Sequence, residues 1–396
     1  MTDENVFEDP PWTVPFRGLF DHAPRAVRIL SPCVGLDAPK RAAKELKVKW
    51  ESTGDFEINP KLEPALRKLG APEEVLHIGP RFGNVCHVDI QDLDRRTDGI
   101  VSGPPCPPFS SIGKRLGDLD ARASVFVAVC LWILHLAANG CLKFFIIENV
   151  EGIVKKRKKD MHSFADWFVS EITKELPRGW AVDVQHGNSI TCCLPQSRPR
   201  VFFVGTAASM RASAFQRRIL NAPLPFFPSV DIIGFLDHEP SEQDYLNLSM
   251  RQQVNVLEQV EGFEKDIAAA AAGPAPSSQS APTVAICDCA RDLCSSVDSQ
   301  RKHGGTRTLR TNNSHPWILP SQAFQATFGP KGRLLNKAEK CRVAGIKPES
   351  VSQMKQEDIE VAIGNTIPVS LVGCIMAPVL RAWVQAARLE DASKDE

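Results

Sequence analysis

The sequence predicts an α/β fold, in which helices cover a mostly parallel sheet and a smaller domain is inserted. Between about residues 26 and 205, short runs rich in valine, isoleucine and phenylalanine alternate with helical stretches. This alternation is typical of parallel strands joined by helical crossovers. After Gly205 the sequence becomes rich in proline, and residues 268–282 are rich in alanine, glycine, proline and serine. The change in composition indicates a second, more irregular unit.

Local patterns predict each element. Asp37 suits the cap of a helix that has Pro39 in its first turn, because a carboxylate accepts from the free N–H groups there and proline needs no partner. Short apolar runs predict strands at residues 27–30, 47–57, 85–88, 98–102, 142–147, 180–185 and 200–204. Longer runs predict helices at residues 61–69, 125–139, 161–176, 336–344 and 369–388.

The composition narrows the classes of function. The chain has 396 residues, of which 43% are hydrophobic, and its 47 basic and 47 acidic side chains cancel. Zero net charge argues against nonspecific coating of nucleic acid but permits a local basic cleft. The 12 scattered cysteines are typical of reduced thiols. We expect no signal peptide and no membrane association, since the longest apolar run, 125–138, is shorter than the ~20 residues that span a bilayer.

A cysteine framed by prolines is the sharpest motif. Cys106 lies in the sequence GPPCPPFS, residues 103–110, directly after a predicted strand. Each proline ring fixes its own φ and restricts the residue before it, so this loop has few shapes. Such a loop holds a thiol at the carboxyl end of a strand, where α/β sheets bind ligands, and a rigid thiol suits a nucleophile. Most free cysteines are buried and inert, so the motif alone leaves both interpretations open.

The ends of the first predicted strands carry a nucleotide-type pattern. The turn that contains Ser31 and Gly35 leads into a helix, whose N-terminus offers N–H groups to a ligand. Glu57 closes the second strand 22 positions after Gly35, near the spacing of ~20 residues for carboxylates that bind ribose. Asp89 is expected to end the third strand and to accept a bond from an adenine amine. Each feature alone equally suits an ordinary turn or a solvated cap.

Three later motifs place polar groups around the same predicted sheet. Glu148 ends an apolar strand, where a carboxylate serves as a helix cap or as a catalytic group. Arg198 and Arg200 precede the next strand, and arginine suits carbonyl or phosphate oxygens, although a solvated basic turn has the same sequence. Gly364 and Asn365 join a turn to an apolar helix.

In this order, the motifs resemble those of the cytosine-C5 DNA methyltransferase family. Residues 103–110 are similar to the family's Gly-Pro-Pro-Cys loop, 148–150 to its Glu-Asn-Val motif, 196–200 to Gln-x-Arg-x-Arg, and 364–365 to Gly-Asn. The resemblance covers residues 27–205 and again about 332–380. It implies a divergent member with the Rossmann-like sheet of class I methyltransferases.

The resemblance also divides the chain. Residues 1–24 are expected to form an N-terminal extension and 25–205 the catalytic domain that binds S-adenosylmethionine. Residues 206–331 correspond to the target-recognition region, with a flexible tract at 268–283. Residues 332–390 are expected to return to the catalytic domain, so that the helix from Val369 packs beside the first strand.

The reaction implied is transfer of the methyl group of S-adenosylmethionine to C5 of a cytosine flipped out of double-stranded DNA. The Cys106 thiolate would add to C6, Glu148 would hold the N3 and N4 edge, and Arg198 and Arg200 would stabilise the O2 side. S-adenosylhomocysteine is the product, no metal is required, and the enzyme acts as a monomer. A eukaryotic chain is expected in the nucleus and any other in the cytoplasm.

The residues expected around the cofactor are Ser31, Cys33, Val34, Gly35, Leu36, Glu57, Ile58, Asp89, Ile90, Pro104, Asn365 and Thr366.

The chain departs from the family at three positions. Ser31 and Cys33 stand where the family usually has Phe and Gly, and Pro107 stands where it has Gln. An aromatic contact to the cofactor and an amide toward DNA are then missing, and the first turn is free to follow another path.

Two alternative functions stay open. The first is a methyltransferase of the same chemistry that acts on transfer RNA, although the Cys-Phe-Thr signature of that relative is not seen. The second is a catalytically weak regulator that binds nucleic acid.

Two further clusters have less certain roles. The basic run 155–159 suits phosphate contact or nuclear localisation, and equally a solvated helix face. Cys287, Cys289, Cys294 and His303 are residue types that bind zinc, but their irregular spacing favours thiols without a metal.

Overall fold

The chain forms two compact units. The first comprises Met1–Asn188, Pro199–Phe227 and Thr366–Glu396, and the second comprises Ser189–Arg198 and Pro228–Asn365. The expected return to the first domain at residue 332 thus differs from the packing boundary at Thr366, and the assignment of 206–331 to target recognition stays a prediction. The computed structural model describes residues 10–105, 123–156, 162–227, 230, 232–238, 244, 246–272, 284–288, 302–303, 306–307, 316–320 and 325–392.

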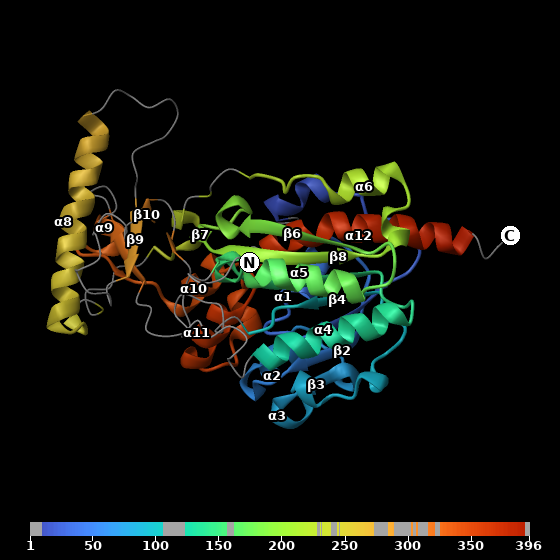
Figure 1. Cartoon of the computed structure of the whole chain (residues 1–396). Coiled ribbons are helices and arrows are strands. Elements are labelled where there is room, and N and C mark those ends of the chain that lie inside the picture. The colour runs from blue at the N-terminus through green and yellow to red at the C-terminus, as the bar shows by residue number, and fades with distance from the viewer. Residues whose placement is uncertain are drawn as a thin grey trace. The chain divides into compact units, whose positions relative to one another are not determined.

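A seven-stranded sheet organises the first unit (Figure 1), in the order β3-β2-β1-β4-β5-β8-β6. Strand β8 runs antiparallel to both of its neighbours, and the other six strands are parallel to one another. The prediction of a mostly parallel α/β sheet is therefore confirmed. The strands are β1 (Val27–Pro32), β2 (Trp50–Glu57), β3 (Leu76–Ile78), β4 (Gly99–Ser102), β5 (Phe144–Val150), β6 (Ala181–Asn188) and β8 (Pro199–Thr206).

The chain crosses the sheet outward from β1, turns back between β3 and β4, and turns back again between β6 and β8. From β1 it proceeds outward through β2 to β3, and from β4 it proceeds the other way to β5. The crevice between the carboxyl ends of β1 and β4 is therefore the topological switch point, where open α/β sheets bind their ligands.

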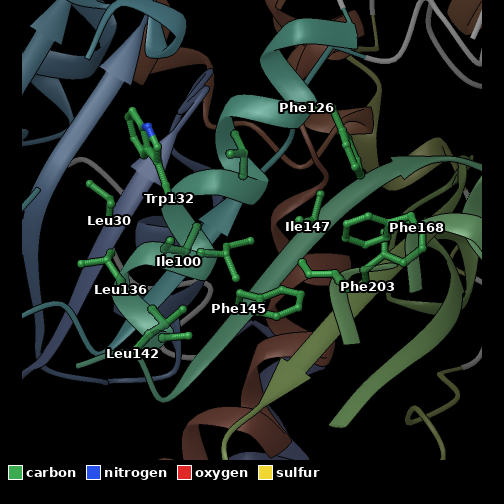
Figure 2. Packing of buried hydrophobic residues seen from close by; sticks show 14 of the residues in the cluster. Leu30, Ile100, Phe126, Trp132, Leu136, Leu142, Phe145, Ile147, Phe168 and Phe203 are labelled. Atoms are coloured by element: carbon green, nitrogen blue, oxygen red, sulfur yellow. The ribbon is translucent and has the colours of Figure 1, made fainter. Parts of the chain in front are cut away.

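Helices complete the first unit. They are α1 (Ala38–Glu45), α2 (Glu63–Lys68), α3 (Gly79–Phe82), α4 (Ala123–Ala138), α5 (Phe164–Glu175), α6 (Ala214–Leu220) and α12 (Val369–Ala392). Figure 2 shows one side of the sheet packed against α4. Ile100 lies beside Leu136, and Phe203 lies beside Phe168 of α5, within one buried cluster. Helix α12 packs against both α1 and α6.

Helix α12 is a long and largely apolar segment of the first unit. The helical stretch Gln356–Ala392, which includes it, is long and apolar enough to cross a membrane by length and composition, with a hydropathy of 1.8. However, 89% of its most apolar window is buried inside the protein. We therefore interpret α12 as a core helix of the first unit.

Side chains that accept hydrogen bonds from backbone N–H groups fix the start of several helices, as the sequence indicates. The Asp37 side chain accepts from the Lys40 N–H at the start of α1, with Pro39 in the first turn. Ser163 and Asp166 form a capping box at α5. One expected strand is wrong: Val85–His87 forms a 3-10 turn, and the third strand is β3, nine residues earlier in the sequence. The Asn84 side chain accepts from the Cys86 N–H and so favours a turn.

The second unit contains a small antiparallel sheet in the order β10-β9-β12-β13 and a two-stranded sheet of β11 and β7. Trp317 and Phe263 lie in its core. A buried ion pair joins Arg333 and Glu339, with 2.6 Å between Nη2 and Oε1. The elements are β7 (Gln196–Ser197), α8 (Met250–Ala272), β9 (Val284–Asp288), β10 (Lys302–His303), β11 (Thr306–Arg307), β12 (Pro316–Pro320), α9 (Gln325–Phe328), β13 (Arg333–Leu334), α10 (Lys337–Val343) and α11 (Gln356–Asn365).

Two expectations concern this second unit. The tract 268–283 begins in helix, because α8 continues to Ala272, and residues 273–283 lie outside the described part of the chain. Cys287 is on β9 and His303 on the neighbouring β10, whereas Cys289 and Cys294 are not described. Among the described residues, no group of three or more His, Cys, Asp or Glu side chains is arranged to hold a metal.

Candidate active site

The turn after β1 has an unusual backbone. Cys33, Gly35 and Asp37 all have positive φ, at 60°, 59° and 52°. Glycine adopts this region freely, whereas a side chain costs roughly 1–2 kcal/mol there. Cys33 therefore adopts a left-handed backbone conformation that glycine adopts more easily. Its side chain adds backbone strain to this turn. Burial raises the pKa of the Cys33 thiol, with the Glu57 carboxylate adding to the effect.

Glu57 joins this turn to the end of β2. Its Oε2 accepts from the Gly35 N–H at 2.9 Å, and its Oε1 accepts from the Asn59 N–H at 2.9 Å. The Val34 N–H also donates to the Phe56 carbonyl oxygen at 2.9 Å. Burial raises the pKa of Glu57, and the backbone N–H groups of Asn59, Gly35 and Ile58 partly offset this. The neighbouring Ile58 side chain is 50% exposed, so it presents an apolar surface beside the carboxylate.

Asp89 does not end a strand. It is an exposed residue that begins a 3-10 turn at Ile90–Asp92, where its side chain accepts from the Gln91 N–H. The expectation that Asp89 ends the third strand is therefore wrong, because the third strand is β3, which pairs with β2 and ends at Ile78. The neighbouring Ile90 is half-buried. Asp89 stays a predicted cofactor residue, carried by a turn on the path to β4.

A hydrogen bond joins the carboxyl ends of the two central strands, β1 and β4. The Ser102 hydroxyl at the end of β4 donates to the Pro32 carbonyl oxygen at the end of β1, over 2.6 Å. Pro104, two residues on, is buried. Cys106 and residues 107–122 lie outside the described part of the chain.

Glu148 and Arg200 meet at the ends of β5 and β8. The Arg200 Nε lies 2.6 Å from the Glu148 Oε1, and the two side chains are 9% and 10% exposed. Gly103 lies beside them, since a methyl group added there would be 3.3 Å from the Glu148 Oε2 and 3.3 Å from Ile367 Cδ1. The start of the proline-framed loop is therefore packed directly against the carboxylate.

Of the remaining predicted residues, Arg198 and Asn365 belong to the second unit and Thr366 belongs to the first. Arg198 is buried and its Nη2 donates to the Gly364 carbonyl oxygen at 2.6 Å, which joins two of the predicted motifs. Asn365, the last residue of α11, is exposed. Thr366 belongs to the first unit, is 5% exposed, and its hydroxyl has no hydrogen-bond partner among the described residues.

Sequence reasoning missed several residues of this region. Ile367 was not singled out, although it lies beside Gly103. Asp55 was also missed; it is a carboxylate on β2 in register with Ser31 of β1, and both are 1% exposed. The signal was present for Asp55, since a charged residue stands two places before Glu57 on the same strand face. Nothing local in the sequence marks Ile367.

The fold is that of a class I methyltransferase: a seven-stranded sheet with one antiparallel strand between β5 and β6, and an acidic residue at the end of β2. Solved structures agree with it. The S. pombe Dnmt2 methyltransferase superposes with a TM-score of 0.53 at 17% identity, over 90% of this chain and 98% of that one. The Entamoeba histolytica methyltransferase EhMeth gives a TM-score of 0.55 at 15% identity, over 90% and 98%. At such identities the likeness is one of fold.

Sequence comparison identifies the family. Residues 76–380 match the family of C-5 cytosine-specific DNA methylases, and the chain belongs to that family. The Type II methyltransferase M.NgoBV of Neisseria gonorrhoeae is 28% identical over 214 residues, which are 52% of this chain and 48% of that protein. The Type II methyltransferase M.DdeI of Desulfomicrobium norvegicum is 37% identical over 118 residues, 30% of this chain and 26% of that protein. The chain thus aligns with about half or less of each.

Proposed function

We propose that the protein transfers a methyl group from S-adenosylmethionine to C5 of cytosine in double-stranded DNA, through a covalent bond between Cys106 and C6 of a flipped base. The observation that carries the proposal is the buried pair of Glu148 and Arg200, packed against Gly103 at the start of the Cys106 loop. A carboxylate paired with a guanidinium beside a cysteine loop matches what nucleophilic addition to a pyrimidine requires.

The residues after β1 and β2 suit the cofactor. Glu57 is held by the Gly35 and Asn59 N–H groups and retains free lone pairs for ribose hydroxyls. Ile58 offers an exposed apolar side chain to an adenine ring. The Thr366 hydroxyl is buried and lacks a hydrogen-bond partner among the described residues, which suits a polar group of a ligand. When bound, S-adenosylmethionine supplies the methyl group.

The protein's own groups perform the remaining steps. The Cys106 thiolate adds to C6 while Glu148 holds the N3 and N4 edge of the base, and Arg200 stabilises negative charge on the carboxylate and on O2. Three Cα–Cα steps of ~3.8 Å lead from Gly103 to Cys106, a reach of at most about 11 Å, so the thiol and Glu148 can face the same base. Loss of the C5 proton then lets the Cys106 thiolate leave. Because C6 is hidden in a duplex, the base must first leave the stack.

The test is covalent trapping. A duplex that carries 5-fluorocytosine should form a stable adduct in the presence of S-adenosylmethionine, because fluorine cannot leave as a proton does. The adduct should map to Cys106 and disappear in Cys106→Ala. The matched control is Cys192→Ser with Cys193→Ser, which changes the two thiols nearest the arginine motif. An active Cys106→Ala, or a dead but folded double serine variant, would overturn the assignment.

A second assay identifies which nucleic acid the protein methylates. Bisulfite sequencing of DNA from a methylation-free host that expresses the chain should show new 5-methylcytosine. Methylation of transfer RNA with none of DNA would support the RNA alternative. Cofactor binding without methyl transfer to either would support the regulatory alternative.

A further inference from the structure

The two arginines of the 196–200 motif have different surroundings. Arg200 pairs with Glu148 in the first unit, with 2.6 Å between Nε and Oε1. Arg198 belongs to the second unit, is 2% exposed, and its Nη2 donates to the Gly364 carbonyl oxygen at 2.6 Å. Short hydrogen bonds from a charged donor are among the stronger kinds. Contact with the O2 side of a cytosine would require Arg198 to give up this bond.

The Gly364 carbonyl group is one that its own helix cannot satisfy. Gly364 is the next-to-last residue of α11. In an α-helix a carbonyl oxygen accepts from the N–H four residues later, and that residue here is Pro368, which has no N–H. The Arg198 guanidinium therefore supplies the missing donor. It also brings a positive charge to the carboxyl end of the helix, where the helix dipole favours one, and both effects stabilise the last turn of α11.

The backbone that carries Arg198 is itself held by two neighbouring segments. The Ser189 hydroxyl donates to the Gln196 carbonyl oxygen, and the Ser189 N–H donates to the Arg198 carbonyl oxygen at 3.5 Å. Gln196 of β7 is also in register with Thr306 of β11. The guanidinium therefore reaches the end of α11 from a segment that is fixed at its base.

Asn365 directly follows the bonded carbonyl group. It is the last residue of α11 and is exposed, so the position of its side chain depends on the position of the helix end. A second contact of α11, between Lys340 Nζ and Glu360 Oε1 at 2.6 Å, lies more than one turn earlier in the helix. That contact holds the middle of α11, whereas the Arg198 bond holds the turn that carries Asn365.

We propose that Arg198 is a positioning residue, whose guanidinium fixes the end of α11 and thereby holds Asn365 in place for cofactor binding. The cofactor contact of Asn365 rests on the proposed function. Arg198 then contributes to cofactor affinity, whereas Arg200 stabilises the charge that develops on the cytosine. The two arginines separate in this way because the chain passes from the second unit to the first between Arg198 and Pro199.

The experiment measures cofactor affinity and methylation in the full chain. Calorimetry gives the Kd of S-adenosylhomocysteine, and methylation of duplex DNA at increasing S-adenosylmethionine separates KM from kcat. In Arg198→Ala we expect Kd and KM to rise about tenfold, the scale of one lost hydrogen bond to a charged group, with a much smaller change in kcat. Arg198→Lys retains a charged donor, should restore part of the affinity, and carries the comparison if the alanine variant does not fold.

A residue that contacts O2 would give the opposite result. Its loss would lower kcat by ~10²-fold or more, the scale of a lost oxyanion donor, with the Kd unchanged. That outcome in Arg198→Ala would overturn the positioning role and return Arg198 to the cytosine.

A cycle of variants tests whether Arg198 acts through Asn365. Asn365→Ala should weaken binding of S-adenosylhomocysteine in the wild type, and much less in an Arg198→Ala background, where the helix end is already displaced. Losses that simply add would contradict the proposal. Glu360→Gln is the matched control, because it removes the contact with Lys340 in the middle of α11 and should leave the Kd unchanged. A rise in Kd equal to that of Arg198→Ala would indicate a general loosening of α11 instead.

Hydrogen exchange at the amides of residues 362–365 separates this inference from the proposed function. A chain that binds no cofactor, but whose α11 amides exchange faster in Arg198→Ala, would support the fixed helix end and count against the proposed function. A wild type that binds S-adenosylhomocysteine, with the same Kd in Arg198→Ala, would overturn the positioning of Asn365 and leave the proposed function standing.

Discussion

Arg200 and Glu148 form a buried ion pair between strands that run in opposite directions, with 2.6 Å between Nε and Oε1. In the register of β5 and β8, Glu148 lies opposite Phe202 and Arg200 lies opposite Val150, so the pair is diagonal. The antiparallel direction of β8 is what brings the start of this strand, and hence its arginine, beside the end of β5. A parallel strand at this place would put its own carboxyl end there.

The first prediction concerns this ion pair. Arg200→Ala should lower the free energy of unfolding by about 3–5 kcal/mol, because it leaves a buried carboxylate without its partner. Glu148→Gln should cost less stability, but should slow methylation by ~10²–10⁴-fold, the usual scale for a positioned acid or base. Urea denaturation and single-turnover kinetics measure the two effects.

The double variant Glu148→Gln with Arg200→Ala is the control for the first prediction. It should recover part of the stability that Arg200→Ala loses, since no charge is left unpaired, and it should remain inactive. If the stability losses of the two single variants simply add, the pair does not stabilise the fold.

The second prediction concerns Gly103. In Gly103→Ala the new methyl group would meet the Glu148 Oε2 and Ile367 Cδ1 at 3.3 Å each, which is closer than ordinary contact. We expect methylation to fall by about tenfold or more, since a displaced carboxylate loses its alignment, while the Tm changes little. Ile367→Val added to this variant should restore part of the activity. Gly234→Ala, whose methyl group would meet nothing within 4 Å, is the matched control.

The third prediction concerns Glu57. Glu57→Ala should weaken binding of S-adenosylhomocysteine by about 1–3 kcal/mol, because the Gly35 and Asn59 N–H groups lose their acceptor and the proposed ribose contact is lost. Glu57→Gln retains an acceptor oxygen and should bind between the wild type and the alanine variant. Calorimetry distinguishes the three proteins. Equal affinity in all of them would remove Glu57 from the cofactor site.

The fourth prediction concerns the N-terminal segment. Trp12 packs against Gly373 of α12, where an added methyl group would lie 2.1 Å from the indole ring, and its Nε1 donates to the Glu45 Oε2 at 2.9 Å. Gly373→Ala should therefore destabilise the protein by about 1–3 kcal/mol through overpacking. In a Trp12→Ala background the same change should cost almost nothing. Chemical denaturation of the four proteins completes the cycle, and equal costs in both backgrounds would argue against the contact.

Local patterns predicted most strands and helices of the first unit because apolar periodicity and caps act within a few residues. Asp37 and Pro39 define the start of α1, and the apolar run before Glu148 defines β5. The expected strand at 85–88 was wrong, and here too the reason is local. Asn84 bonds to the backbone two residues on, and this turn replaces the strand that the apolar residues suggest.

The candidate site was predictable only as a set of positions at strand ends. Gly35, Glu57 and Glu148 could be placed there, because each follows a predicted strand. Their partners could not be read from the sequence. The contact of Gly103 with Ile367 and the bond from Arg198 to the Gly364 carbonyl oxygen join residues more than 150 positions apart.

The sequence by itself determined the α/β class, the order of the elements and the motifs that carry the family resemblance, since these depend on residue type and short spacing. Only the tertiary structure decided that β8 lies antiparallel between β5 and β6, that Arg200 therefore pairs with Glu148, and that Asp37 and Asp55 are both buried. The physical reason is that strand pairing and burial arise from the packing of segments distant in sequence, and packing sets the environment of a charge.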